Sequence, residues 1–443
     1  MQLRLSALLL IPALFGAEPA KLPEPFQSIS DLAGAAPPEF TADALLRIVE
    51  SGKLADKAAR RELLEHAFQL AASAKFPVQM QAGQGTTTDT RAGSLSDAYA
   101  LKLDTLSLQS RAVRDMLSLD PASARDLFGQ IVKPVLTPLT CDDALGYQPS
   151  EFYLALSAVV NGGFTPKEKT KEEHFNLLVD SLGQVTSPSQ LAPLAQAIES
   201  ASVTSAQRQL LAARFNGLLE NMQTDSRSFA SSLPALFAIN TPGIQPSLEK
   251  YQQKNHGCDT DAAPSSSTSS TSSTSSTSST SSKQPSTPNL DPYWQSATAQ
   301  QLLQAGKKLR FSPATQLLSD ADRATPEWQQ QLADYLNLIA GWTEDPAESD
   351  AVFYHEKCIV YTALLDLVPA GPQSDKIVAE YIDFIGNSGL YQKSPAEWFL
   401  EPHTLLDRSH SVSAQLATLD AYRNSGNPVL ALEVAIQKAF GAK

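Results

Sequence analysis

A run of serine and threonine between Pro264 and Pro288 constrains this chain more than any other feature. It repeats the triplet Ser-Ser-Thr five times. These side chains can bury almost no apolar surface, so nothing offsets the conformational entropy that ordering them would cost. The ends of a flexible coil of this length lie roughly 27 Å apart on average. The sequence therefore predicts a low-complexity, disordered linker over residues 259–289 that joins two folded bodies.

On both sides of the linker, the apolar residues recur at helical spacing, whereas alternation with a period of two is almost absent. Many of the expected helices begin at Ser, Thr or Asp followed by Pro, a pattern typical of helix starts. We expect an all-α fold: an array of helical hairpins, of the α-solenoid type, in an N-terminal domain over 26–255 and a C-terminal domain over 290–443. The expected helices cover 41–49, 53–75, 96–119, 122–132, 150–161, 166–181, 187–200, 205–222, 226–239, 292–304, 313–323, 326–342, 346–368, 374–387, 402–425 and 428–440. Residues 76–94 are expected to form an exposed loop with weak β character, and 134–149 an irregular segment.

The end of the chain resembles one turn of a tetratricopeptide repeat. Tyr422, Gly426 and Ala431 have the spacing of the aromatic, turn glycine and small residue of that helix–turn–helix. The next small residue of the repeat would fall on Lys438, and the preceding Leu-Gly pair is missing. The resemblance thus implies a TPR-like helical hairpin at this place and does not identify a family.

The first residues have the pattern of a signal peptide. Arg4 is followed by an apolar stretch and then by the small residues Gly16 and Ala17. We expect residues 1–17 to be a signal peptide and the protein to be exported, to a periplasmic or extracellular location. A buried N-terminal helix is the alternative. No later segment reaches the length of about 18 apolar residues that a transmembrane helix needs, so none is expected after signal removal.

The charge of the chain limits its partners. The formal net charge is −13, and the regions on both sides of the linker are acidic. Nucleic-acid-binding domains carry a basic surface, so we expect no nucleic-acid partner. Binding to anionic membranes is disfavoured for the same reason.

Three cysteines suit an oxidising compartment with one disulfide and one free thiol. Cys141 and Cys258 lie in polar, turn-like contexts next to Asp, whereas Cys358 lies within a helical apolar pattern. The sequence predicts a Cys141–Cys258 disulfide and a buried Cys358. Three free thiols are the competing interpretation, because spacing cannot show proximity.

One set of residues has metal-ligand spacing. His403, Asp407 and His410 would share one face of a helix, and two imidazoles with a carboxylate suit a transition metal. The alternative is a solvent-facing polar surface that contains a His–Asp pair. His355-Glu356 lacks the second histidine of a zinc-protease helix, since position 359 is Ile359. We therefore place His355 at the polar edge of a buried helix.

The acidic stretch 343–350 lacks the central glycine of a calcium-binding loop. We interpret its acidic residues as lying at the N-terminus of a helix, where the helix dipole favours negative charge. No phosphate-binding loop, dinucleotide fingerprint or nucleophile elbow is present, so no cofactor is expected and no catalytic residue can be assigned.

The fold class favours a binding role over catalysis, because helical arrays present extended surfaces to other macromolecules. We expect an exported protein-interaction or scaffolding module of the cell envelope, with protein partners. The alternative is an α/α-type extracytoplasmic enzyme with a carboxylate site between helical hairpins. A purely structural envelope component is a third possibility. Buried carboxylates that converge in one deep pocket would favour the enzyme, whereas a broad shallow groove with exposed aromatic side chains would favour binding.

Overall fold

A computed structural model of the chain is mostly helical, which confirms the all-α prediction. It describes residues 22–82, 91–133, 136–140, 143–222, 243–254, 296–311, 317–393, 398–401 and 412–440, together with residues 227 and 405. The expected signal peptide over 1–17, the linker over 259–289 and almost all of the expected helix over 226–239 lie outside these residues.

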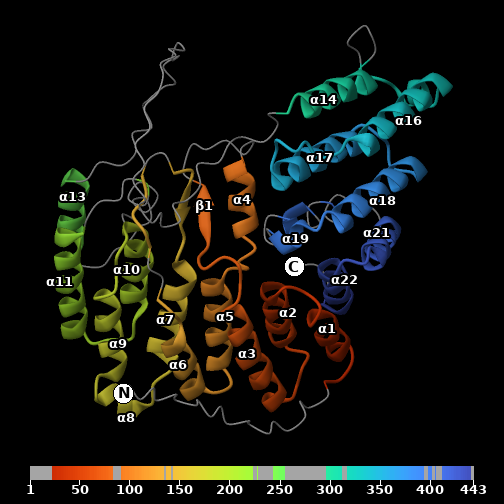
Figure 1. Cartoon of the computed structure of the whole chain (residues 1–443). Helices are drawn as coiled ribbons and strands as arrows, with labels where there is room; N and C mark the ends of the chain where they lie inside the picture. The colour runs from red at the N-terminus through yellow and green to blue at the C-terminus, as the bar shows by residue number, and fades with distance from the viewer. Residues whose placement is uncertain are drawn as a thin grey trace, which may run out of the picture.

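The N-terminal part is a row of helices in which each element packs on the next. From α2 onward, contacts link α2 to α3, α3 to α5, α5 to α6 and α7, α7 to α9 and α10, and these two helices to α11, which contacts α13. Figure 1 shows this row running from the red helices α1 and α2 to the green helix α13. The bounds are α1 Phe26–Ala33, α2 Pro38–Glu50, α3 Lys57–Ala71, α4 Arg91–Tyr99, α5 Thr105–Leu117, α6 Pro121–Gln130, α7 Ser150–Gly162, α8 Pro166–Thr170, α9 Glu173–Leu182, η1 Pro188–Gln190, α10 Leu191–Ser200, α11 Ser205–Asn221 and α13 Gln245–Lys254.

The helix starts follow local chemistry. The side chains of Asp56, Asp104 and Asp120 accept hydrogen bonds from the first backbone N–H groups of α3, α5 and α6. Proline opens α2, α6, α16 and α18, where its missing N–H costs nothing. These are short-range effects, which explains why many boundaries could be predicted from the sequence.

Two of the expected long helices are broken in the structure. The predicted helix over 96–119 is wrong: α4 ends at Tyr99 and α5 begins at Thr105. Lys102 between them has a φ of 58°, and Asp104 then caps α5. The predicted helix over 166–181 is similarly interrupted at Glu172, which has a φ of 62°. In both places a residue with a left-handed backbone conformation interrupts the helix. Lysine and glutamate rarely adopt this conformation, so the sequence does not predict the interruption.

The segments predicted as loops contain a small sheet. Strand β1, Met80–Ala82, pairs antiparallel with β2, Leu145–Tyr147, and Met80 lies opposite Tyr147. Helix α4 packs on β1, and Met80, Leu95 and Leu145 belong to a separate small hydrophobic cluster. This sheet joins the two segments that precede α4 and α7.

The C-terminal part is a second set of neighbouring helices. Contacts link α14 to α16 and α17, α17 to α18, α18 to α21 and α21 to α22. The bounds are α14 Ala297–Arg310, α15 Asp320–Arg323, α16 Pro326–Gly341, α17 Asp350–Leu365, α18 Pro372–Asn387, α19 Leu390–Lys393, α21 Val412–Asn424 and α22 Pro428–Phe440. In Figure 1 this set runs from α14 at the top right to the dark blue α22 near the centre.

The last helix lies against the first helices of the chain. Helix α22 contacts α1 and α2, and Figure 1 shows them side by side. The rings of Phe26 and Phe440 stack with their centroids 6.0 Å apart, and those of Phe40 and Phe399 meet edge to face at 5.0 Å. Buried residues of both parts form one continuous hydrophobic cluster. The two parts therefore share a seam, which we define as the contact of α22 and Phe399 with α1 and α2.

Within the described residues, no helix is long and apolar enough to cross a membrane.

Candidate functional site

The residues that the sequence singled out as sites mostly lie outside the described part of the chain. This holds for the metal-ligand candidates His403, Asp407 and His410, and for Cys141 and Cys258. The metal site and the disulfide therefore stay predictions. Among the described residues, no group of three or more His, Cys, Asp or Glu side chains has an arrangement that could hold a metal ion.

Helix α17 carries five consecutive polar or reactive residues, Tyr354 to Cys358, and all of them are buried. His355 is only 1% exposed, so its predicted place at a polar helix edge is wrong. Its Nδ1 lies 3.7 Å from Oε1 of Glu401, and the other carboxylate oxygen, Oε2, accepts a hydrogen bond from the Tyr381 hydroxyl at 3.1 Å. The segment that contains Glu401 brings its carboxylate to this face of α17, and the sequence spacing could not show this.

The thiol of Cys358 is unsuited to nucleophilic chemistry in this environment. Cys358 is a free cysteine with no exposed surface. Burial raises the pKa of the thiol well above its usual value, and the nearby Glu401 raises it further. Since the thiolate is the reactive form, the combination of Cys358, His355 and Glu401 is not an activated cysteine site.

Glu356 and Lys357 connect α17 to other segments. One carboxylate oxygen of Glu356 accepts a hydrogen bond from the backbone N–H of Ser296, just before α14, at 3.0 Å. The ammonium of Lys357 donates to the Trp342 carbonyl at 2.8 Å and lies over the rings of Phe353 and Phe384. These contacts give both side chains a structural role.

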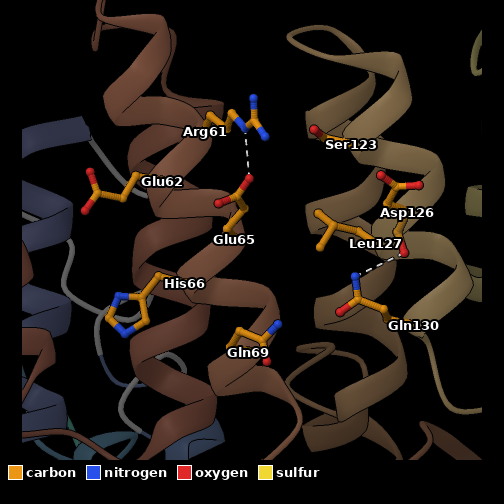
Figure 2. A pocket seen from close by; sticks show the side chains of 9 residues that line it. All are labelled: Arg61, Glu62, Glu65, His66, Gln69, Ser123, Asp126, Leu127 and Gln130. Atoms are coloured by element: carbon orange, nitrogen blue, oxygen red, sulfur yellow. Dashed lines mark hydrogen bonds and ion pairs between the residues drawn. The ribbon is translucent and has the colours of Figure 1, made fainter. Parts of the chain in front are cut away.

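The described surface contains open grooves between neighbouring helices. A groove of about 480 Å³ lies between α3 and α6 and is lined by residues one turn apart on each helix. Figure 2 shows Arg61 and Glu65 on the side of α3 that faces α6, and Leu127 on the side of α6 that faces α3. Arg61 forms ion pairs with Glu65 at 2.8 Å and with Asp120 at 3.2 Å. This α3/α6 groove is thus broad and lined mainly by polar, water-exposed side chains.

Two further grooves lie on either side of α16. The α14/α16 groove has a volume of about 510 Å³, and the α16/α18 groove about 220 Å³. Asn337 lines both of them.

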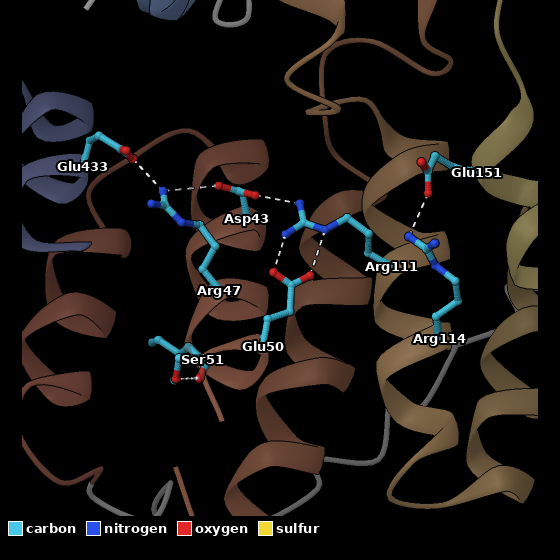
Figure 3. A network of polar contacts seen from close by, with 9 residues as sticks. Asp43, Arg47, Glu50, Ser51, Arg111, Arg114, Glu151 and Glu433 are labelled. Atoms are coloured by element: carbon cyan, nitrogen blue, oxygen red, sulfur yellow. Dashed lines mark hydrogen bonds and ion pairs between the residues drawn. The ribbon is translucent and has the colours of Figure 1, made fainter. Parts of the chain in front are cut away.

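A network of ion pairs includes one pair that crosses the seam, Arg47 with Glu433, and continues from α2 to α5. Arg111 on α5 binds both carboxylate oxygens of Glu50 on α2, at 3.1 and 2.9 Å, and Asp43 at 2.6 Å. Arg47 on α2 lies 3.9 Å from Asp43 and binds Glu433 on α22 at 2.7 Å. Figure 3 shows this chain of contacts passing from α22 through α2 to α5. We call these five residues the seam network.

The seam network is largely shielded from water. The side chains of Arg47 and Glu433 are 7% and 8% exposed. An ion pair in such surroundings is little screened by salt, and removing one partner would leave the other as an unpaired buried charge.

The buried carboxylates do not converge on one cavity. Asp43 and Glu433 belong to the seam network, Glu151 binds Lys102 and Arg114 at 2.6 and 2.7 Å, and Glu356 binds Ser296. Within the described residues, none of these carboxylates lines the α3/α6 groove or the two grooves beside α16.

Two aspartates of the N-terminal part titrate close to neutrality. Burial raises the pKa of Asp104 to about 6, although hydrogen bonds from Ser107 oppose the change. Burial and then the neighbouring Glu50 raise the pKa of Asp115 to about 6. In the unfolded chain each carboxyl group has a pKa near 3.8. In the folded protein each group therefore stays protonated up to a higher pH.

We expect Asp104→Asn to stabilise the protein at pH 7 by about 1–3 kcal/mol. Asn keeps the acceptor for the Ser107 N–H, which Asp104 binds at 3.0 Å, without burying a charge. Because the folded pKa of Asp104 is raised, the wild type gains stability as the pH falls through 6, and its difference from Asp104→Asn should become small near pH 4, just above the unfolded pKa of 3.8. Urea unfolding from pH 4 to 7 measures this difference in the free energy of unfolding.

Asp104→Ala is the control, since it also removes the helix cap and should cost about 1 kcal/mol of stability relative to Asp104→Asn at every pH. Equal stability of wild type and Asp104→Asn at pH 7 would contradict the expectation.

Peptide mapping without reduction tests the cysteine prediction. We expect a peptide that links Cys141 to Cys258, and alkylation of Cys358 only after denaturation, because its sulfur is fully buried. The predicted bridge closes a long loop and would stabilise the fold by roughly 4–5 kcal/mol in the chain-entropy model. A disulfide that involves Cys358, or rapid alkylation of Cys358 in the native protein, would refute this assignment.

Comparison with known proteins identifies no relative: no family model, curated protein or solved structure matches the chain.

Proposed function

We propose that this chain is an exported, helical-array protein that binds other proteins through the grooves between its helices, as a scaffolding module of the cell envelope. The observation that carries the proposal is the contrast between the buried carboxylates and the grooves. Asp43, Glu151, Glu356 and Glu433 are engaged in contacts that hold different helices together, whereas the grooves are open and lined by side chains that reach water. A catalytic site would require reactive groups directed at a bound substrate.

The order of helix contacts supports the array. Apart from the small sheet and the contact of α2 with α5, the contacts described above link helices that are neighbours in the row, and α22 to α1 continues the row across the seam. Such an arrangement provides a long surface with many helix–helix grooves. We propose an α-solenoid-like array in which the two helical bodies, joined by the linker, also meet at the seam.

The α/α-type enzyme stays the alternative. Glu39 is 3% exposed and burial raises its pKa, which is a feature that catalytic carboxylates share. It nevertheless lies in the first turn of α2 and lines none of the grooves described above.

Photo-crosslinking in the cells that produce the protein tests the binding role. Replacing Gln69 in the α3/α6 groove or Asn337 beside α16 with p-benzoylphenylalanine should give adducts with another protein. The same residue at Gln252, which is exposed on α13, serves as the control. Adducts no more abundant at the groove positions than at Gln252 would refute the proposal.

Export is tested by fractionation of the same cells. We expect the protein outside the cytoplasm and shortened by about 16–20 residues, the span of a short signal peptide. Recovery of the chain from the cytosol with Met1 intact would contradict export.

A further inference from the structure

His174 is a buried histidine at a point where several helices of the N-terminal part meet. It lies in the first turn of α9 and is only 5% exposed. The centroid of its ring is 6.2 Å from that of Phe164, in the segment between α7 and α8. Its imidazole also hydrogen-bonds to the backbone of Ser202, in the connection between α10 and α11. His174 thus lies between the segment that follows α7 and the connection that precedes α11.

Asn161 and Lys169 join the same segments by hydrogen bonds. At the end of α7, the side chain of Asn161 accepts a hydrogen bond from the Ser202 N–H at 2.8 Å and donates to the Ser200 carbonyl at 3.2 Å. The ammonium of Lys169 on α8 donates to the main-chain carbonyl of Asn161 at 2.8 Å. We define the α9 joint as the residues Asn161, Phe164, Lys169, His174 and Ser202.

The α9 joint favours the neutral form of His174. Burial lowers the pKa of His174 below its usual 6.5, and the nearby ammonium of Lys169 lowers it further. Glu172 and the Ser202 backbone act in the opposite direction, with a smaller effect. Among the described residues, no group hydrogen-bonds to Nδ1 of His174, so a proton added there would be buried without an acceptor. The positive end of the α9 dipole also disfavours a cation at this position.

The other charged groups around the joint are engaged in contacts of their own. Arg125 on α6 pairs with Glu168 on α8 at 2.7 Å. Arg208 on α11 donates to three carbonyls at the end of α10. Glu172, which precedes α9, is exposed and accepts a hydrogen bond from Gln207 on α11 at 3.0 Å. Both Glu168 and Glu172 thus already have hydrogen-bond or ion-pair partners.

We propose that the α9 joint is a proton-operated switch, in which protonation of His174 separates the start of α9 from the connection between α10 and α11. A protonated imidazole needs water or a counter-ion, and the closed joint places it near the Lys169 ammonium instead. Opening the joint hydrates the ring and breaks the hydrogen bonds that Ser200 and Ser202 make with Asn161. Helix α11 packs on α9, so its position against α9 changes with the pH. This inference does not depend on the proposed binding function.

Hydrogen exchange of the backbone amides, followed by mass spectrometry, tests the switch in the full-length chain. Because the folded pKa of His174 is lowered, the closed joint is fully stable above the unfolded pKa of 6.5 and loses stability as the pH falls below it. After correction for the intrinsic effect of pH, peptides that cover 161–175 and 200–208 should exchange about 3- to 10-fold faster near pH 5 than near pH 7.5. Peptides from α14 and α16 serve as the internal reference.

Four substitutions separate protonation from packing. His174→Gln keeps a hydrogen-bonding side chain that gains no charge in acid, so it should abolish the faster exchange. Lys169→Gln removes the cation near the ring and should move the midpoint of the transition to higher pH, whereas Glu172→Gln should move it to lower pH. His66→Gln is the matched control, because His66 is an exposed histidine on α3, and it should leave exchange at the joint unchanged.

Titration of the His174 imidazole by nuclear magnetic resonance is a second measurement, which does not require a variant to fold. We expect His174 to titrate below pH 6.5 in the native chain. Titration at or above pH 6.5, exchange at the joint that is equal at both pH values, or faster exchange that persists in His174→Gln would each overturn the inference. Equal acceleration throughout the chain, or an unchanged midpoint in Lys169→Gln, would also overturn it.

Discussion

Replacing Arg47 with methionine is expected to lower the free energy of unfolding by about 3–5 kcal/mol. Arg47 binds Glu433 at 2.7 Å, and both side chains are more than nine-tenths buried. Without the guanidinium, Glu433 would keep its desolvation penalty and lose its counter-ion. Asp43 would remain paired with Arg111, so the loss is concentrated at the seam.

The double variant Arg47→Met with Glu433→Leu separates this charge effect from packing. It leaves no unpaired charge at the seam, so most of the lost stability should return. Lys53→Met is a surface control. Lys53 donates a hydrogen bond to the Ala439 carbonyl at 2.8 Å from an exposed position and should contribute about 1 kcal/mol or less to the free energy of unfolding.

Urea unfolding followed by circular dichroism reports the unfolding of the whole chain. Tryptophan fluorescence reports the C-terminal part alone, because all four tryptophans follow residue 290. A double variant as unstable as Arg47→Met would contradict the ion-pair argument.

Cutting the chain between residues 255 and 295 is expected to leave two fragments that stay associated. The seam combines two aromatic contacts with the Arg47–Glu433 pair, and none of these needs a continuous chain. A protease site inserted near Ser272 allows the cut to be made in the folded protein, and size-exclusion chromatography should then show co-elution. The Ser/Thr run lies in this region, so the cut itself should not disturb a packed core.

Charge reversal at the seam should release the fragments. Glu433→Arg brings a second cation against Arg47, and we expect it to weaken the association of the fragments about 100- to 1000-fold, which corresponds to the cost of an unpaired buried charge. Each fragment should retain its helical circular dichroism after separation, because the packing between neighbouring helices within each part is independent of the seam. Wild-type fragments that separate directly on cleavage would show that the seam is weaker than its contacts indicate. Fragments that unfold on separation would instead refute the prediction of two folded bodies.

The helical character of this protein and many helix boundaries follow from its sequence. Helix α22 occupies the predicted residues 428–440, and α16 begins at the predicted Pro326. Proline at the first position, capping residues and helical apolar spacing act over a few residues, so the sequence contains enough information to place these helices. The interruption at Lys102 could not be predicted in the same way, because a left-handed backbone at a lysine is not a local preference.

The contacts between distant residues were decided by the tertiary structure alone. The sequence determined that helices dominate, that Cys358 lies on an apolar helix face and that a Ser/Thr-rich run lies between the N-terminal and C-terminal helices. It did not show that β1 pairs with β2, that Glu401 reaches His355, or that Arg47 meets Glu433 almost 400 residues later. An arginine or glutamate in an amphipathic helix has the same local pattern whether water or another helix covers it. Its burial depends on which helices pack together, and that choice depends on the whole core.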